Sequence, residues 1–462
     1  MNAPPYDSPP VAQSGTSPRH LSPQRLGARL LEAPPSVLHP ITRRRTLKAV
    51  CGAAFIAAGL GACGKTTATN TASSAPSGWQ IPLATSTITP NGVWATVAMG
   101  HLQDPLNTFW QLPYRPAGKG TWTNQVKATA TATNGGLILA SAANRLMVAI
   151  RPSVDLTYTP LIETGNGGIT WSSGLIDQAL AATPAALGLD PAGRAMAITS
   201  AKTGSQLEFD NGNPSSWKTV ADLQSLNSSP AGKACGAHSF TAVGYAGAAV
   251  IVGASCSSPG STGIFVRGAN GWVPGGPKLS GLASSTVTVL AARPSPVAAP
   301  GTATGSNAAG TGSNTASPGA DTASTALAVL LGVTGPAGQD PHLVVTWSHD
   351  ATTWQTSPPI AVGSTDSVLS FGPTSGSGLF VVIRGPGATI LPYITSGPGT
   401  AWTKLPAAPP GTATLASGHA NSIQALAVND TVLRFWTLDS STNAWVDSQT
   451  MQVNIEFGSS NP

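Results

Sequence analysis

One residue type recurs along this chain at a nearly constant interval: tryptophan, each time after a segment rich in turn-forming residues. Seven such tryptophans align: Trp122, Trp171, Trp217, Trp272, Trp354, Trp402 and Trp445. Their spacings are 49, 46, 55, 82, 48 and 43 residues, and the outlier contains a low-complexity run, residues 294–325, of about thirty residues. Without that run the interval is about fifty residues throughout, which is typical of repeat architectures.

Each repeat reads as four short strands. In the last repeat we expect strands at 413–418, 423–428 and 432–438, then a turn and a fourth strand that opens at Trp445. The repeat before it gives 368–372, 379–384 and 388–395, then a turn and Trp402. Runs of β-branched residues separated by Gly, Pro, Asn and Ser clusters are typical of all-β proteins.

A four-stranded sheet of this kind cannot bury both of its faces alone, and radial packing of the sheets solves that problem. The sequence therefore predicts a seven-bladed β-propeller over residues 81–462, with residues 294–325 as an insertion. Six or eight blades remain alternatives, because the first unit (83–126) and the tail after Trp445 are irregular. The chain has 52 Gly and 40 Pro, but 41% apolar residues and 12 Trp favour a packed core over disorder.

The turns before three of the tryptophans carry a common pattern. It is fullest in the segment from Thr164 through Asn166 to Trp171, shorter in Ser348-His349-Asp350-Ala351-Thr352-Thr353-Trp354, and degenerate before Trp402. This pattern resembles the Asp-box, or bacterial neuraminidase repeat, of a β-propeller superfamily. The resemblance implies a structural turn, in which an Asx side chain accepts backbone N–H groups and the tryptophan packs the hairpin end against its own blade.

The N-terminal region resembles an export leader. Arg43, Arg44 and Arg45, followed by Thr46-Leu47, are similar to the twin-arginine motif. Residues 49–62 are then uncharged and rich in Ala and Gly, and fourteen residues are too few to span a bilayer as a helix. The long segment before the arginines indicates either an extended disordered leader or a true start further along, for example near Val37.

The leader ends in a pattern similar to the bacterial lipobox: Leu60, Gly61 and Ala62, followed by Cys63. The resemblance implies that residues 1–62 are removed and that Cys63 carries a lipid. Residues 63–80 would then be a flexible tether, and the mature protein would lie at the outer face of the bacterial cytoplasmic membrane. An ordinary secreted protein cleaved elsewhere, or a buried Ala-rich helix, are the alternatives.

The positive charge is confined to this leader. The chain carries a formal charge of +5, and residues 1–62 hold seven basic and two acidic residues. From residue 63 onward there are sixteen of each, so the mature part is formally neutral and its basic residues form no cluster. Nucleic acid is therefore not expected as a partner.

The sequence shows no catalytic, metal-binding or cofactor-binding constellation. Its histidines have no metal-ligand spacing, and no phosphate-binding or nucleophile-elbow motif is present. A sialidase-like hydrolase would need an arginine trio, a Tyr/Glu pair and an Asp. Glu163 and Glu208 occupy equivalent third strands, and Arg151 and Arg384 end equivalent second strands, so repetition accounts for them. We expect no catalytic residue, metal or cofactor.

Two cysteines remain for the mature body once Cys51 has left with the leader and Cys63 is lipidated. Cys235 and Cys256 are expected to form a disulfide, as exported pairs usually do. In a hairpin of 239–244 with 248–253 that turns at Tyr245-Ala246, the numbers of two paired residues add up to 491. The numbers of Cys235 and Cys256 also add up to 491, so the two cysteines would lie opposite each other.

These features together predict a membrane-tethered propeller that acts as a binding or assembly module in the cell envelope. Its partners would be the membrane, through the lipid, and a protein or an envelope polymer. Assembly factors of the Asp-box superfamily, which the chain resembles, suggest a role in assembly. The alternative is a sialidase-like glycoside hydrolase, degenerate or unrecognised.

Overall fold

The computed structural model describes ten segments of the chain, all within the compact unit Lys65–Pro462. The described residues are 79–100, 108–125, 136–151, 160–175, 184–201, 204–210, 217–268, 271–295, 326–336 and 339–453. The leader 1–62, the lipobox with Cys63 and the arginines Arg43, Arg44 and Arg45 lie outside these segments, and so does most of the predicted tether.

The described chain is built almost entirely from short antiparallel strands. The first three units contain β1 (Thr85–Thr89), β2 (Gly92–Gly100), β3 (Thr108–Gln111), β4 (Pro113–Pro116) and β5 (Thr123–Asn124); β6 (Gly136–Ala142), β7 (Arg145–Arg151), β8 (Pro160–Thr164) and β9 (Ser172–Leu175); β10 (Ala186–Leu189), β11 (Ala195–Ala201), β12 (Gly204–Phe209) and β13 (Lys218–Asp222). The next two contain β14 (Ala237–Ala246), β15 (Ala249–Cys256), β16 (Ile264–Gly268) and β17 (Gly271–Gly275); β18 (Thr286–Ser295), β19 (Ala326–Thr334), β20 (His342–Ser348), β21 (Gln355–Thr356) and β22 (Ile360–Ala361). The last two contain β23 (Ser367–Pro373), β24 (Leu379–Arg384), β25 (Ile390–Thr395) and β26 (Thr403–Lys404); β27 (Thr412–Ser417), β28 (Ile423–Asn429), β29 (Val432–Asp439) and β30 (Ala444–Gln452).

Strand pairing groups these strands into seven antiparallel units that follow one another along the chain. The fourth and fifth units count as one nine-stranded sheet only because of the single pair Ser255↔Thr288 between β15 and β18. The first unit departs from the four-strand pattern, since β3 adds to β2 beside the path β1-β2-β4-β5. The expected all-β class and β-propeller fold are confirmed.

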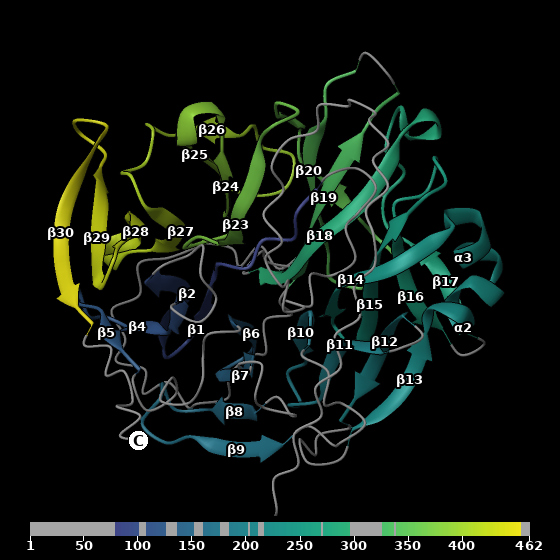
Figure 1. Cartoon of the computed structure of the whole chain (residues 1–462), viewed down its shortest axis with the longest axis horizontal. Helices are drawn as coiled ribbons and strands as arrows, with labels where there is room; N and C mark the ends of the chain where they lie inside the picture. Colours follow the sequence, from purple (N-terminus) through teal and green to yellow (C-terminus); the bar gives the residue numbers. More distant parts are fainter. Residues whose placement is uncertain are drawn as a thin grey trace, which may run out of the picture. The chain divides into compact units, whose positions relative to one another are not determined.

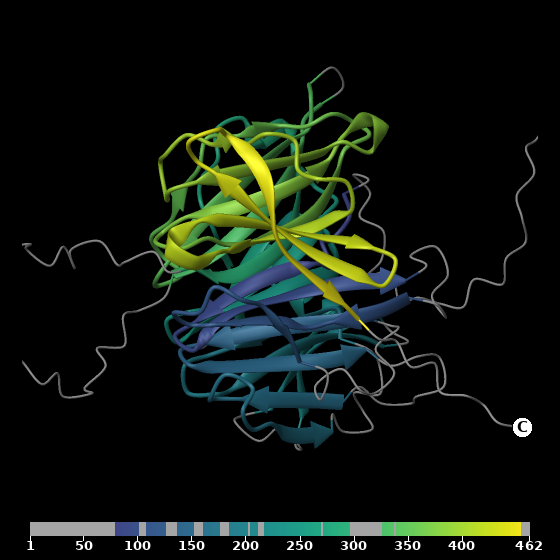
Figure 2. The same cartoon turned by 90° about the vertical axis from the view of Figure 1, so that its left-hand side faces the viewer.

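The units are arranged around a common centre with their first strands innermost (Figure 1). β1, β6, β10, β14, β18, β23 and β27 contact one another in turn around the ring, and β27 meets β1 and β2 to complete it. Figure 2 looks at this seam, where the last unit, in yellow, lies above the dark-blue strands of the first. Each inner strand is therefore covered by its two neighbours.

Seven apolar clusters hold the ring together, and each combines side chains from two neighbouring units. One repeat tryptophan belongs to each cluster. Trp217, for example, is 4% exposed and packs among Ile138 and Met147 of the unit before it. Each cluster also contains residues of the tryptophan's own unit, so the tryptophans lie between their own blade and the preceding one, and the contact with the preceding blade adds to the expected one.

Several of these tryptophans also donate their indole N–H to the preceding unit. Trp402 donates to the carbonyl of Pro358 over 3.0 Å, and Trp445 to that of Pro406 over 3.2 Å. Trp122 repeats this pattern across the seam by donating to Oε1 of Gln424 over 2.8 Å. The repeat tryptophan therefore joins consecutive sheets, and the same contact joins the last sheet to the first.

The chain enters the ring through a short segment, Trp79 to Ala84, which we call the strap. Trp79 donates its indole N–H to Thr334 Oγ1 of the fifth unit over 3.1 Å, and its ring lies against Gly332. Ala84 forms a parallel bridge with Ser370 of the sixth unit before β1 begins. Trp79 and Ala84 therefore contact the fifth and sixth units before the first strand begins.

The strap defines the two faces of the ring. All inner strands begin on the side that the strap crosses, which we call the strap face. Antiparallel pairing then puts the loop between second and third strands on this face, and the turns before the repeat tryptophans on the opposite face, which we call the turn face.

Other boundaries also differ from expectation. β18 continues through Ser295, so the low-complexity run does not begin at Pro294, and its remainder lies outside the described residues. The described part of the tail after Trp445 forms a strand, because β30 pairs with β29 through Gln452 with one register shift. Two short helices, α2 (Leu223–Ser228) and α3 (Pro230–Cys235), precede β14. In the described part of the chain no helix is long and apolar enough to cross a membrane.

Candidate functional site

The strap face carries a cavity of about 420 Å³ beside the strap. Strap residues Gln80 to Ala84 form one wall, and the sixth, seventh and first units form the others through Arg384, Ile390, Thr412, Val428 and Trp110. Arg384 ends β24, and the chain turns back into β25 after it, so the turn holds its side chain at the rim. Leu83 is 50% exposed and faces the solvent from the strap.

A second cavity, of about 390 Å³, lies on the seventh unit and the loop that leads into it from the sixth. The two share Pro410, Gly411 and Val428, so they form one continuous surface that we call the strap-face groove. Arg434 and Trp436 of β29 line its far end. The loop from β26 to β27 can pass between the cavities because Gly411 has a φ of +80° and its missing Cβ would meet Val428 O at 2.3 Å.

The groove is positively charged. Arg384 and Arg434 line it, and its described lining contains no carboxylate. Among the described residues Arg434 forms one ion pair, with Asp447 at 3.8 Å between partly exposed side chains, which holds the guanidinium weakly. Guanidinium groups match carboxylates and phosphates, and an aromatic ring such as that of Trp436 offers a flat apolar surface. This arrangement suits an extended ligand that carries negative charge.

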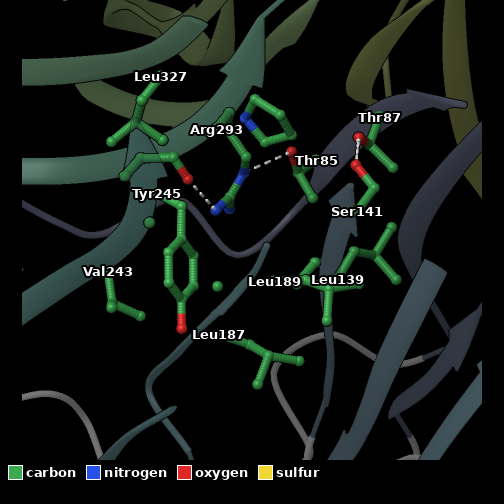
Figure 3. Close-up of a pocket in the computed structure, with 15 residues that line it drawn as sticks. Thr85, Thr87, Leu139, Ser141, Leu187, Leu189, Val243, Tyr245, Arg293 and Leu327 are labelled. Carbon is green, nitrogen blue, oxygen red and sulfur yellow. Dashed lines mark hydrogen bonds between the residues drawn. The ribbon is translucent and has the colours of Figure 1, made fainter. Parts of the chain in front are cut away.

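The axis of the ring is a different environment. Two cavities of about 30 and 20 Å³ lie there among the inner strands, with Arg293 lining both and Tyr245 lining the larger (Figure 3). Burial lowers the pKa of Arg293 to about 10, so it remains charged at neutral pH. Burial, with Asp190 and Asp210 nearby, raises the pKa of Tyr245, whose hydroxyl is buried without a hydrogen-bond partner in the described structure.

These axial residues bear on the hydrolase alternative. That family would need several arginines with a Tyr/Glu pair facing the axis, whereas the described lining contributes one arginine, one tyrosine and no glutamate. Glu163 instead pairs with Arg145 in its own unit, and Glu208 accepts a hydrogen bond from Thr219 Oγ1 at 2.7 Å. Both glutamates lie on third strands, β8 and β12, away from the axis.

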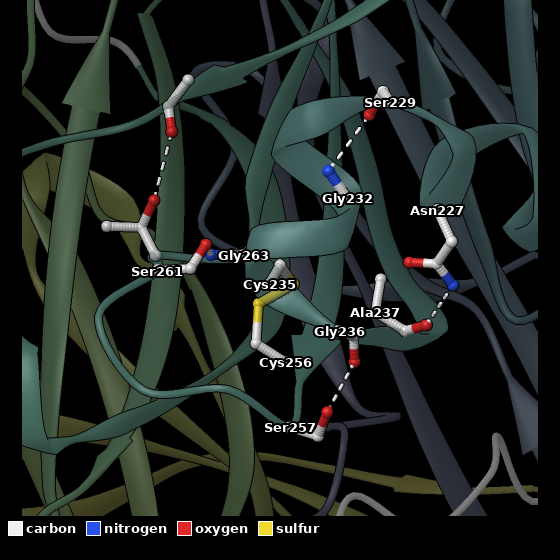
Figure 4. The surroundings of a disulfide bond; sticks show 12 residues. Asn227, Ser229, Gly232, Cys235, Gly236, Ala237, Cys256, Ser257, Ser261 and Gly263 are labelled. Atoms are coloured by element: carbon white, nitrogen blue, oxygen red, sulfur yellow. Dashed lines mark hydrogen bonds between the residues drawn. A yellow bond between two sulfur atoms is a disulfide. The ribbon is translucent and has the colours of Figure 1, made fainter.

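The predicted disulfide between Cys235 and Cys256 is confirmed, with Cα atoms 4.9 Å apart (Figure 4). The register used to predict it is wrong. Ala246 pairs with Ala249, so the hairpin turns at Gly247-Ala248, and two bulges in β14 shift the pairing further. Cys235 is the last residue of α3, and Gly236 ends that helix in the left-handed conformation, so the bridge ties a helix to β15.

The turns that resemble the Asp-box form compact hydrogen-bonded loops on the turn face. Asn166 Oδ1 accepts the N–H of Thr170 at 3.0 Å, and Asp350 Oδ1 accepts those of Thr352 and Thr353 at 2.8 and 2.7 Å. These bonds hold the pKa of Asp350 well below its usual range. Both side chains are occupied by their own loops, so they stabilise structure and leave the strap face to other residues.

Some residues of the candidate site were not predicted. In the sequence, Arg384 is explained as a repeat position, and no pattern marks Arg293, Arg434 or the strap. Asp439 forms a third turn of the same kind, accepting from Ser441 N at 2.8 Å, which lowers its pKa. One signal was available: Arg293 is the single charged residue in the ten residues of β18.

Among the described residues no group of His, Cys, Asp or Glu could hold a metal ion.

Comparison with known proteins adds little to this geometry. No protein-family model matches the chain, and no curated protein matches it. Among solved structures, a fungal lectin from Aleuria aurantia, described as a six-bladed β-propeller with a fucose recognition mode, has a TM-score of 0.38 and 13% identity. The match covers 71% of this chain and 94% of the lectin.

A second similar structure is TolB from Acinetobacter baumannii, with a TM-score of 0.38 and 10% identity over 67% of this chain and 62% of TolB. At such scores and identities, neither likeness indicates what this chain binds. The site must therefore be interpreted from its own residues.

Proposed function

We propose that this protein is an exported lipoprotein, anchored through Cys63 at the outer face of the cytoplasmic membrane, whose propeller binds a cell-envelope partner in the strap-face groove. The groove carries the proposal: it combines two cavities, two guanidinium groups and the ring of Trp436 without an opposing carboxylate in its described lining. Such a site favours an anionic partner, either an envelope polymer or an acidic segment of a protein.

The neutral mature body supports the same proposal. Its sixteen basic and sixteen acidic residues give no overall field, so attraction to an anionic partner would come from the local groove. The hydrolase alternative has no specific observation in its favour, because the described axis contributes a single arginine and no glutamate. We therefore advance the binding module alone.

The anchor is tested by Cys63→Ala in the full chain, expressed in a bacterium that processes lipoproteins. Wild-type protein should be retained with the membrane and released by detergent, whereas the variant should appear in the soluble exported fraction. One fatty chain gives only marginal retention, so the diacyl group is needed. Equal retention of both proteins would contradict the anchor.

The groove is tested by placing a photo-crosslinking residue at Leu83 on the strap face and, as a matched control, at Ile169 on the turn face. Both side chains are exposed apolar residues, at 50% and 83%, so both positions tolerate replacement. Irradiation of intact cells should give a discrete adduct from position 83 that Arg384→Gln and Arg434→Gln weaken together. Equal labelling from both positions would show that the groove is not the site.

A further inference from the structure

A guanidinium group lies at the centre of the ring with only part of its hydrogen-bonding capacity used. Arg293 Nε donates to Thr85 Oγ1 at 3.1 Å, and Nη1 donates to the carbonyl of Ala292 at 3.0 Å (Figure 3). A guanidinium has five N–H donors in a fixed plane. In the described structure two of them have partners, and three are left for whatever occupies the axial cavities.

The positive charge of this group is not balanced by the described protein. No ion pair involves Arg293, and neither axial cavity is lined by a described carboxylate. The surroundings are apolar side chains from β6, β10, β14 and β19 together with a few hydroxyls. Arg293 is half-buried among these side chains, and a charge in such surroundings is favoured by a counter-charge beside it. Water molecules could satisfy the donors, but they could not supply that charge.

The size of the space limits what the counter-charge can be. The larger cavity measures about 30 Å³ and the smaller about 20 Å³. The larger one also presents the hydroxyls of Thr87 and Ser141, which bond each other at 2.5 Å and offer one remaining hydrogen. Such a volume admits one or two particles of the size of a water molecule and excludes an organic carboxylate or a phosphate ester.

We propose that the larger axial cavity binds a single halide-sized inorganic anion, chloride under ordinary conditions, against the free N–H groups of Arg293. The anion neutralises the guanidinium, and the guanidinium in turn holds Thr85 at the base of the strap. Thr85 Oγ1 also donates to the carbonyl of Phe371 in the sixth unit over 2.8 Å. Anion binding would therefore stabilise the contact between strap, fifth unit and sixth unit.

The direct test uses wild-type protein and needs no variant. Crystals are grown in chloride, transferred to bromide, and measured at the bromine absorption edge. An anomalous peak beside Arg293 in the axial cavity is the expected result. Bromide peaks at surface positions only, with water density in the axis, would overturn the proposal.

A second measurement follows the unfolding midpoint in sodium chloride and in sodium gluconate at equal ionic strength. A ligand that binds only the native state raises the midpoint with its concentration, so chloride should raise it by about 2 °C or more over a tenfold range while gluconate does not. Arg293→Met should abolish the difference, and Arg267→Met, at an exposed position on β16, should keep it. A midpoint with equal dependence on both salts would refute the site, whether or not Arg293→Met folds.

Discussion

At the scale of single residues, two equivalent turns differ in one charge. Asn166 and Asp350 both accept backbone N–H groups through a side-chain oxygen, but only the second can titrate. Backbone bonds from Thr353 and Thr352 favour the ionised carboxylate and lower its pKa. The folded-state pKa lies below the unfolded value of about 3.9, so the stabilisation is present above that value and disappears as the pH falls towards the folded pKa.

This difference predicts that the pH dependence of stability follows the aspartate and can be transferred from one turn to the other by substitution. Asp350→Asn should lower the free energy of unfolding by about 1 kcal/mol or less at pH 7, because the site is exposed. The difference in free energy of unfolding from wild type should shrink as the pH falls from 7 to 2. The measurement is urea unfolding over that range. The reciprocal Asn166→Asp should introduce the same acid sensitivity into the second unit. A difference in free energy of unfolding that stays constant with pH would show that the charge of Asp350 contributes nothing to stability.

Single residues also show where sequence reasoning stops. The alignment placed each repeat tryptophan within one residue of the start of an outer strand, because packing at a sheet interface constrains both residue type and spacing. The groove residues Arg384 and Arg434 obey no such constraint. In the sequence, such a charged residue is indistinguishable from an ordinary surface residue. Only the fold shows that segments distant in sequence lie together in one groove. The strap was missed for the same reason, since its partners are about 250 residues away in sequence.

At the scale of elements, the disulfide joins a helix to a strand that the sequence treated as one hairpin. The pairing was predictable from the two cysteines that remain in the body of a chain expected to be exported. Its geometry was not, because the bulges of β14 and the two short helices before it have no periodic signature. Asp222 caps α2 and Ser229 caps α3, so local side chains rather than repeats set this segment.

Loss of the disulfide should release this helical segment before the sheet. The cysteines are 21 residues apart, and a loop of that size contributes about 3 kcal/mol when closed. Cys235→Ser/Cys256→Ser should therefore unfold at lower denaturant, with hydrogen exchange rising first in the amides of α3. The wild type in reductant should approach the variant, and the variant should not respond to reductant. Uniform exchange across β14 and β15 would contradict a local role.

At the scale of the whole molecule, the ring closes mainly through side chains, with one backbone hydrogen bond from Gly100 N–H to Asp430 O at 3.2 Å. Neither the first nor the last unit lends a described strand to the other, and Trp122 with its partners spans the gap. Its ring stacks on Phe435 at 5.1 Å, and its backbone N–H and C=O both bond the Gln449 amide at 2.8 Å. These contacts add to the apolar cluster that the first and last units share and to the hydrogen bond that Arg115 Nη2 donates to Ser417 O at 2.8 Å. Single contacts among them can be removed by substitution.

Gln449→Ala should weaken the contact between the first and last units. It removes two hydrogen bonds and leaves a part-buried backbone amide and carbonyl without partners, for an expected loss of about 1–3 kcal/mol in the free energy of unfolding. Gln452→Ala is the matched control on the same strand, because its amide bonds Thr431 Oγ1 at the exposed surface. Urea unfolding of both variants, with amide exchange at Trp122, separates the two effects. Equal losses would mean that the seam bears no particular share of the stability.

The position of the strap has a mechanical consequence. If the chain is held at its N-terminal end, any tension enters the propeller at Trp79, where one hydrogen bond and one face of an indole meet the fifth unit. Beyond that contact the pull reaches Thr85 and then β1, the innermost strand of the first unit. Force applied along the tether would thus act on the inner strands of the ring rather than on its outer strands.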